Sequence, residues 1–158
     1  MAGTDVSSGQ TSGTQSALGV DMALEVVTLP VSDVDRAKRF YESLGWRLDI
    51  DLVVNEEVRT VQFTPPHSPC SIQFGKGGTA AEPGSMAGLI LVVKDIDAAR
   101  DALISRGVDV SEVEEMRPPG FDSPGRSYFA RARFSDPDGN GWQLQEITTR
   151  LPGREWED

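Results

Sequence analysis

The sequence predicts an α+β fold of two paired β-α-β-β-β modules whose curved sheets enclose a cavity. Three observations support this prediction: the chain contains an internal repeat, both copies show the same order of strand and helix patterns, and a Gly/Pro-rich stretch joins them. We expect an N-terminal tail over residues 1–20, modules over 22–75 and 88–150, a linker over 76–87 and a C-terminal tail over 151–158.

The repeat aligns LPVSDVDRAKRFYESLG (29–45) with LVVKDIDAARDALISRG (91–107) without a gap. Equivalent residues stand 62 positions apart, as from Leu29 to Leu91. The identical pairs are Leu29/Leu91, Val31/Val93, Asp33/Asp95, Asp35/Asp97, Ala37/Ala99, Ser43/Ser105 and Gly45/Gly107. This match indicates two copies of one structural unit.

Each copy begins with an apolar run rich in β-branched residues, ALEVVTLPV or GLILVV, which predicts a strand. Asp33 and Asp95 can cap the following helix through a side-chain oxygen. Apolar residues then recur at helical spacing and give each helix one buried face. Gly45 and Gly107 come where each helix is expected to end.

Strand-like segments follow each helix: WRLDIDLVV, VRTVQFT and CSIQFG in the first copy, and VDVSEVEEM, SYFARARFS and GWQLQEIT in the second. The stretch 75–88 is typical of a linker, and MRPPGFDSPGRS, residues 116–127, of a longer loop. Since one module exposes one face of a small sheet, two modules can pair around a ligand cavity.

Composition argues against several classes of partner. A formal net charge of −10 disfavours binding to nucleic-acid phosphates. No apolar run is long enough to cross a membrane or resembles a secretion leader, and the single cysteine, Cys70, fits a reducing compartment. We therefore expect a cytoplasmic protein with a small-molecule ligand, no nucleic-acid partner and no membrane partner.

The stretch FSDPDGNGWQLQE, residues 134–146, resembles the start of a calcium loop. Such a loop needs a bidentate Glu at its twelfth position, but that position holds Ile147, and the Glu comes one residue early, at Glu146. We interpret the stretch as a tight turn that leads into a strand.

Paired β-α-β-β-β modules with LPVSDVDRAKRFYESLGW near the start and FSDPDGNGWQLQE near the end resemble the vicinal oxygen chelate superfamily. That group contains glyoxalase I, bleomycin resistance proteins and extradiol dioxygenases. The resemblance covers about residues 22–150. It implies a ligand site in the curved-sheet cavity and a homodimer.

Metal enzymes of that superfamily take one ligand from the first strand and one from the last strand of each module. By resemblance, these places fall on Val26, Gln73, Gly88 and Glu146. Val26 and Gly88 have no donor atom, and a Gln carbonyl is a weak ligand. Because a catalytic metal site needs about three protein ligands, we expect no metal and no cofactor.

Trp142, Leu144 and Glu146 share one face of the last strand, and the resemblance implies that this face lines the cavity. There Glu146 could act as a catalytic acid or base, or it could be a structural carboxylate held by an arginine such as Arg131 or Arg133. Arg126, Tyr128 and Arg131, in or near the 116–127 loop, could close over an anionic or aromatic ligand. The expected substrate-binding residues are Val26, Gln73, Gly88, Tyr128, Arg131, Trp142 and Leu144.

Two functions of different classes fit such a cavity. One is a cofactor-free isomerase, lyase or cyclase in which Glu146 moves a proton. The other is a non-catalytic protein that sequesters a drug or metabolite, as in the bleomycin-resistance branch, and a third option is a paralogue without a ligand. The sequence does not separate the first two, because both need the same cavity.

Overall fold

The computed structural model describes residues 19–157, so the expected tail over 1–20 lies almost wholly outside the described residues. Both modules lie in the unit formed by residues 24–148. Residues 149–157 contain no helix or strand, and among them the Arg150 guanidinium lies 4.9 Å from the centroid of the Trp156 ring. No helix within the described range is long and apolar enough to cross a membrane.

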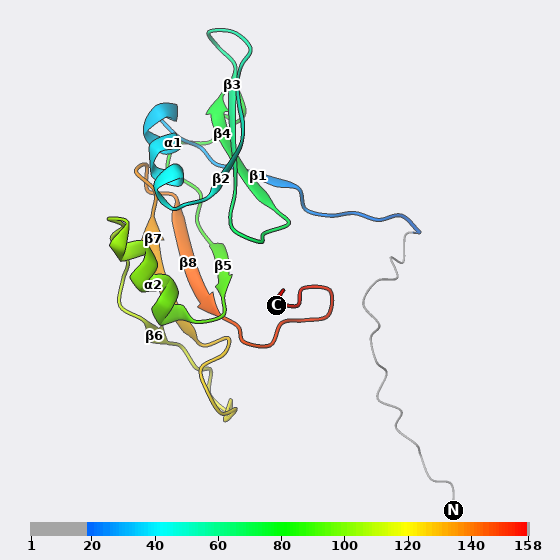
Figure 1. Ribbon diagram of the computed structural model, residues 1–158, viewed down its shortest axis with the longest axis vertical. Helices are drawn as coiled ribbons and strands as arrows, with labels where there is room; N and C mark the ends of the chain where they lie inside the picture. Colours follow the sequence, from blue (N-terminus) through cyan, green and yellow to red (C-terminus); the bar gives the residue numbers. More distant parts are fainter. Residues whose placement is uncertain (1–18, 158) are drawn as a thin grey trace, which may run out of the picture. The chain divides into compact units, whose positions relative to one another are not determined.

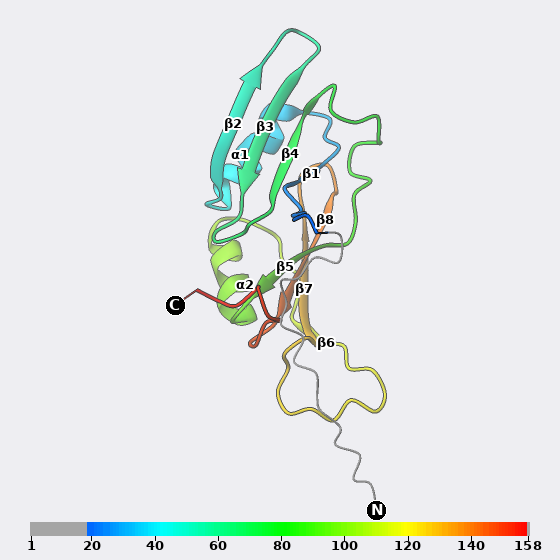
Figure 2. The ribbon, with the colours of Figure 1, turned by 90° about the vertical axis from the view of Figure 1, so that its right-hand side faces the viewer.

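The first module contains β1 (Val26–Thr28), α1 (Val34–Ser43), β2 (Arg47–Val53), β3 (Arg59–Thr64) and β4 (Ser71–Lys76). Its four strands form sheet A in the order β1-β4-β3-β2 (Figures 1 and 2). β1 is parallel to β4, and the other neighbours are antiparallel.

The second module repeats this arrangement with β5 (Leu89–Val93), α2 (Ile96–Ser105), β6 (Glu114–Glu115), β7 (Ala130–Ser135) and β8 (Gly141–Glu146). Sheet B has the matching order β5-β8-β7-β6. The predicted α+β fold of two β-α-β-β-β modules is therefore confirmed, with curved, four-stranded mixed sheets.

Strand β6 is much shorter than the predicted segment VDVSEVEEM. Next to it, Ser111 donates its backbone N–H to the Arg133 carbonyl at 2.9 Å, but the Arg133 N–H donates to the Ser111 hydroxyl rather than to a backbone carbonyl. A side-chain hydroxyl thus replaces a backbone carbonyl in the hydrogen bonding between the strands, and regular strand pairing begins only at Glu114.

Both helices begin and end where the repeat predicts. The Asp33 carboxylate accepts a backbone N–H of the first turn at 3.0 Å, and Asp95 does the same at 3.1 Å. Gly45 and Gly107 follow the helices with φ of +80° and +85°, a conformation that favours glycine.

Each helix covers one side of its own sheet, which we call the helix side; the opposite side is the open face. The helix sides of both sheets contribute to one continuous core. The Trp142 ring lies 5.3 Å from Trp46 and 6.3 Å from Tyr41, between ring centroids, so aromatic packing crosses from one module to the other. The buried strand residues on the helix sides are Val61, Phe63, Ile72, Phe74, Ala130, Ala132, Phe134, Trp142 and Leu144.

A buried carboxylate, Asp136, joins the modules at the turn before β8. Its Oδ2 accepts the Tyr41 hydroxyl at 2.9 Å and the Asn140 side-chain N–H at 2.8 Å. Its Oδ1 accepts the backbone N–H groups of Asp138 and Asn140 at 3.0 and 2.9 Å. The Trp142 indole N–H donates to the Tyr41 oxygen at 3.1 Å. We call Asp136, Asn140, Tyr41 and Trp142 the clamp.

Asn140 extends the clamp to the linker. Its side-chain N–H also donates to the Pro30 carbonyl at 2.9 Å, and its Oδ1 accepts the Met86 N–H at 3.1 Å. Gly84 packs so closely that a Cβ there would stand 2.0 Å from the Asp138 carbonyl oxygen. The DPDGN turn is therefore structural, as predicted, and the protein itself occupies the Asp136 oxygens.

Replacing Tyr41 by Phe tests the clamp. Burial raises the pKa of the Tyr41 hydroxyl, and the Asp136 charge raises it further, so the group remains a donor at neutral pH. Its loss leaves the Trp142 N–H without an acceptor and removes one donor from Asp136. We expect Tyr41→Phe to lower the free energy of unfolding by about 1–3 kcal/mol in urea titrations. Tyr128→Phe, at the exposed tyrosine, is the control and should change it little; an equal loss in both variants would contradict the role of the clamp.

Candidate functional site

The open faces carry no helix of the 24–148 unit, and Figures 1 and 2 show α1 and α2 each beside its own sheet. Strand pairing identifies the side chains on these faces, because residues paired across neighbouring strands lie on the same side. On sheet A they include Val26, Thr28, Arg47, Ile50, Leu52, Thr60, Gln62, Thr64, Ser71 and Gln73, and on sheet B Ile90, Val92, Glu114, Arg131, Arg133, Gln143 and Gln145.

The two open faces correspond residue by residue. Thr28 pairs with Gln73 in sheet A, and Ile90, which follows Thr28 by the repeat offset, pairs with Gln143 in sheet B. Gln73 and Gln143 are therefore equivalent, and each lies on the strand beside the first strand of its module. The Gln73 amide donates to the Thr28 hydroxyl at 2.9 Å. The sequence contains a pattern that identifies Gln143. In both IQF (72–74) and WQL (142–144) a Gln stands between two buried apolar residues.

The last strand turns a different face toward the open side than we expected. Trp142, Leu144 and Glu146 lie on the helix side and are 4%, 2% and 6% exposed. The last-strand position equivalent to Gln73 is thus Gln143 and not Glu146. Spacing from the DPDGN turn alone did not determine which face of the strand meets the helix. Leu144 instead lines an apolar pocket of about 230 Å³ that also contacts α2.

Both carboxylate oxygens of Glu146 have partners. Oε2 accepts the backbone N–H of Ile96, at the start of α2, at 3.0 Å. Oε1 accepts the Arg126 Nε–H at 3.1 Å, and Arg126 also donates to Asp97 at 2.6 Å. These contacts fit a structural glutamate held by an arginine, the second of the two roles considered, but the arginine is Arg126 and not Arg131 or Arg133. A proton-transfer role for Glu146 stays a prediction.

The places where the resemblance implies metal ligands do not fit a metal. Val26 pairs with Ser71, two residues before Gln73 on the same face of sheet A. Gly88 precedes β5 with φ of +81°, and no atom beyond its chain neighbours lies within 4 Å of the place where its Cβ would stand. Neither supplies a donor, so only the two amide oxygens of Gln73 and Gln143 remain. Over residues 19–157, no three His, Cys, Asp or Glu side chains are grouped so that they could hold a metal ion.

Tyr128 lies near the end of the irregular loop that precedes β7. It has φ of +71°, which costs a non-glycine residue about 1–3 kcal/mol. Two hydrogen bonds hold it: its N–H donates to the Glu146 carbonyl at 2.7 Å, and its own carbonyl accepts the Gln145 side-chain N–H at 2.8 Å. The Tyr128 side chain stays exposed at this end of sheet B.

Two guanidinium groups lie on the open face of sheet B. Arg131 stands between Gln145 of β8 and Glu114 of β6, and Arg133 stands opposite Gln143. Neither forms an ion pair with another described residue, and the Arg131 Nε is buried without a hydrogen-bond partner. Arg131 was expected at the site, whereas Arg133 was considered only as a partner for Glu146.

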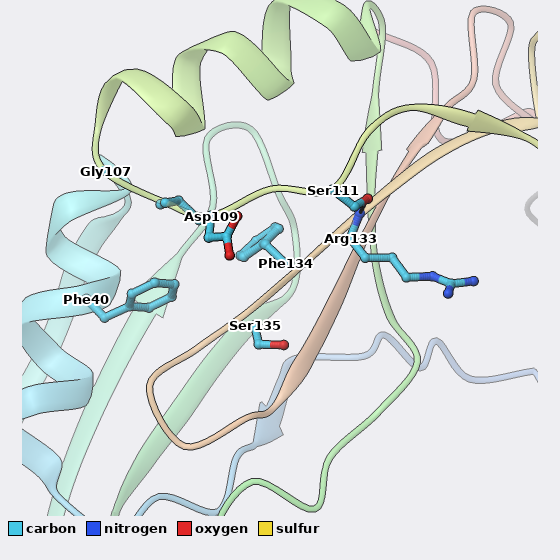
Figure 3. Close-up of a pocket in the computed structure, with 8 residues that line it drawn as sticks. Phe40, Gly107, Asp109, Ser111, Arg133, Phe134 and Ser135 are labelled. Atoms are coloured by element: carbon cyan, nitrogen blue, oxygen red, sulfur yellow. Dashed lines mark hydrogen bonds between the residues drawn. The ribbon is translucent and has the colours of Figure 1, made fainter.

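A groove of about 510 Å³ lies where α1 meets the second module, and Arg133 is among the residues that line it (Figure 3). The Asp109 carboxylate lies in it, between the rings of Phe40 and Phe134. The Arg133 side chain extends away from these three groups. The view agrees with the strand register, which puts Phe134 on the helix side and Arg133 on the open face.

The fold and these faces define a class of proteins: paired β-α-β-β-β modules with ligand sites on curved sheets. A family model of the Glyoxalase/Bleomycin resistance protein/Dioxygenase superfamily matches residues 23–144. The chain therefore belongs to this superfamily, which confirms the resemblance seen in the sequence.

Solved structures support the assignment. The chain is similar to TnmS3, an antibiotic binding protein from Streptomyces sp. CB03234, with 31% identity, coverage of 80% of this chain and 97% of that chain, and a TM-score of 0.65. A glyoxalase/bleomycin resistance protein from the same organism has 32% identity, coverage of 78% and 99%, and a TM-score of 0.61. A superfamily member from Sphaerobacter thermophilus DSM 20745 has 31% identity, coverage of 80% of this chain and 98% of that chain, and a TM-score of 0.63. A search of curated proteins found no match.

The contacts of Glu146 predict the effect of removing its charge. Glu146→Gln keeps an acceptor for the Ile96 N–H but loses the carboxylate that pairs with Arg126 and stabilises the α2 N-terminus. We expect the free energy of unfolding to fall by about 1–2 kcal/mol in urea titrations. Glu114→Gln, at an exposed glutamate of β6, serves as the control. Unchanged stability of Glu146→Gln would show that these contacts do not hold the strand to the helix.

Proposed function

We propose that this protein binds a small organic molecule on its open sheet faces and leaves it chemically unchanged. The observation that carries the proposal is the separation of the two sides of sheet B. The carboxylate expected to do chemistry, Glu146, is engaged on the helix side, while the open face presents Gln143, Arg131 and Arg133. The likeness to TnmS3, described as an antibiotic binding protein, supports binding rather than turnover.

We further propose that the site is completed by a second copy of the chain. Ile50 and Leu52 on sheet A are 41% and 55% exposed, and Ile90 on sheet B is 52% exposed. Apolar side chains at such exposure gain stability when a second open face covers them. In such a homodimer Val26 and Gly88 would lie beside the ligand with Gln73. The one free cysteine, Cys70, suits the cytoplasmic location that we propose.

A second candidate is a metal-free isomerase or lyase in which Glu146 transfers a proton. One observation favours it: the Glu146 Oε1 is held by Arg126, from the irregular loop before β7, so a movement of this loop would free that oxygen. The test is to recover a bound compound after long incubation and analyse it by mass spectrometry. Recovery unchanged supports sequestration; conversion by the wild type that stops in Glu146→Gln would establish catalysis.

Ile90→Lys tests the location of the site. A charged side chain at the open face should prevent both assembly and ligand binding, because an ammonium group is costly to bury. We expect light scattering to give about 17.1 kDa for the variant and twice that mass for the wild type. Calorimetric titration should show at least a tenfold loss of affinity for any compound that binds the wild type.

Ile104→Lys is the matched control, because Ile104 is 42% exposed but lies on α2. It should keep the mass and the affinity of the wild type. A wild-type monomer would overturn the dimer, and full binding by Ile90→Lys would overturn the location on the open face.

A further inference from the structure

We propose that the ligand is an organic anion, an apolar body with a carboxylate or sulfonate group, and that Arg131 and Arg133 bind this group. The inference rests on the proposed function, since it concerns the same open face. Both residues lie on β7, two positions apart, so their Cα atoms stand about 7 Å apart on one side of the strand. Guanidinium groups are well suited to paired hydrogen bonds with the oxygens of such anions.

The first module shows that the fold does not need these charges. Gln62 pairs with Gln73 as Arg133 pairs with Gln143, and Thr60 pairs with Gly75 as Arg131 pairs with Gln145. The equivalents of the two arginines are therefore the neutral residues Thr60 and Gln62. Sheet A forms the same strand order without them, so strand pairing alone does not explain two cations on sheet B.

Some arginines of the chain form ion pairs, whereas Arg131 and Arg133 form none with a described residue, and Arg131 differs further in having a buried Nε without an acceptor. Arg59 binds Asp35 and Asp51, and Arg126 binds Asp97 and Glu146. Arg131 makes no such pair with any residue that the structure describes, and its Nε–H is buried without an acceptor. A buried donor without a partner is destabilising, and an anion bound at Arg131 would offset that penalty through local rearrangement.

The surroundings of the arginines suit the apolar body of such a ligand. Ile90 lies opposite Gln143 on the same face and is 52% exposed. Tyr128 stands at the end of the face, held in its left-handed conformation by the Gln145 side chain and the Glu146 backbone. An aromatic acid could place its ring against the Ile90 side chain and its acid group at the arginines of β7, because Ile90 and Arg133 flank Gln143 on the same face.

The net charge of the chain opposes anion binding, so any preference for an acid needs a local cause. The chain carries a formal charge of −10, so long-range electrostatics disfavour any anion. A preference for an acid over its neutral amide must therefore come from cations close to the ligand.

The test uses three acids with their neutral amides: 2-naphthoate, indole-3-acetate and anthraquinone-2-carboxylate. Calorimetry on the wild-type protein should show that at least one acid binds about tenfold or more tightly than its amide. Arg131→Gln and, separately, Arg133→Gln should bring the ratio of acid to amide affinity close to one, because each variant weakens binding of the acid more than binding of its amide. Arg39→Gln removes an exposed arginine from α1 and is the control that should bind like the wild type.

The outcomes separate the inference from the proposed function. If acids and amides bind the open face equally, or if both arginine variants keep the acid preference, the inference is wrong and the binding function stands. If no acid and no amide binds, both are wrong. An acid preference lost in either arginine variant and kept in Arg39→Gln supports both.

Discussion

The Asp136 carboxylate sits where the first module, the linker and the second module meet, and it accepts four hydrogen bonds there. A buried charge of this kind is tolerated only when its acceptor positions are filled, so Tyr41, Asn140 and the turn must all be in place together. This requirement holds the helix sides of both sheets in one core. The consequence is that both sheets keep an open face.

The two open faces share the same strand arrangement but carry different side chains. The repeat gives equivalent strands and equivalent amides, Gln73 and Gln143, on both sheets. The positions beside them differ, since Thr60 and Gln62 on sheet A are replaced by Arg131 and Arg133 on sheet B. A symmetric scaffold thus presents one face with exposed apolar side chains and one face with two neighbouring arginines, which suits a ligand with one apolar part and one charged part.

The sequence predicted the fold well because the repeat, the caps at Asp33 and Asp95 and the glycines after the helices are local signals. It predicted the site less well. Alternation along β8 showed that Trp142, Leu144 and Glu146 share a face but not which face meets the helix, and only tertiary packing decides that. Strand β6 was overestimated because the Ser111 hydroxyl replaces a backbone acceptor, a contact that strand propensity does not encode. The pattern IQF and WQL would have identified Gln143.

The most direct test of the account labels the isoleucine methyl groups for NMR and adds 2-naphthoate. Ile50 and Ile90 lie on the open faces, whereas Ile72 and Ile96 are 4% and 0% exposed in the core. If the ligand binds the open faces, the Ile50 and Ile90 signals will shift and show contacts to the naphthalene protons while the Ile72 and Ile96 signals stay in place. Ligand contacts to Ile72 or Ile96, with Ile50 and Ile90 unchanged, would contradict the account.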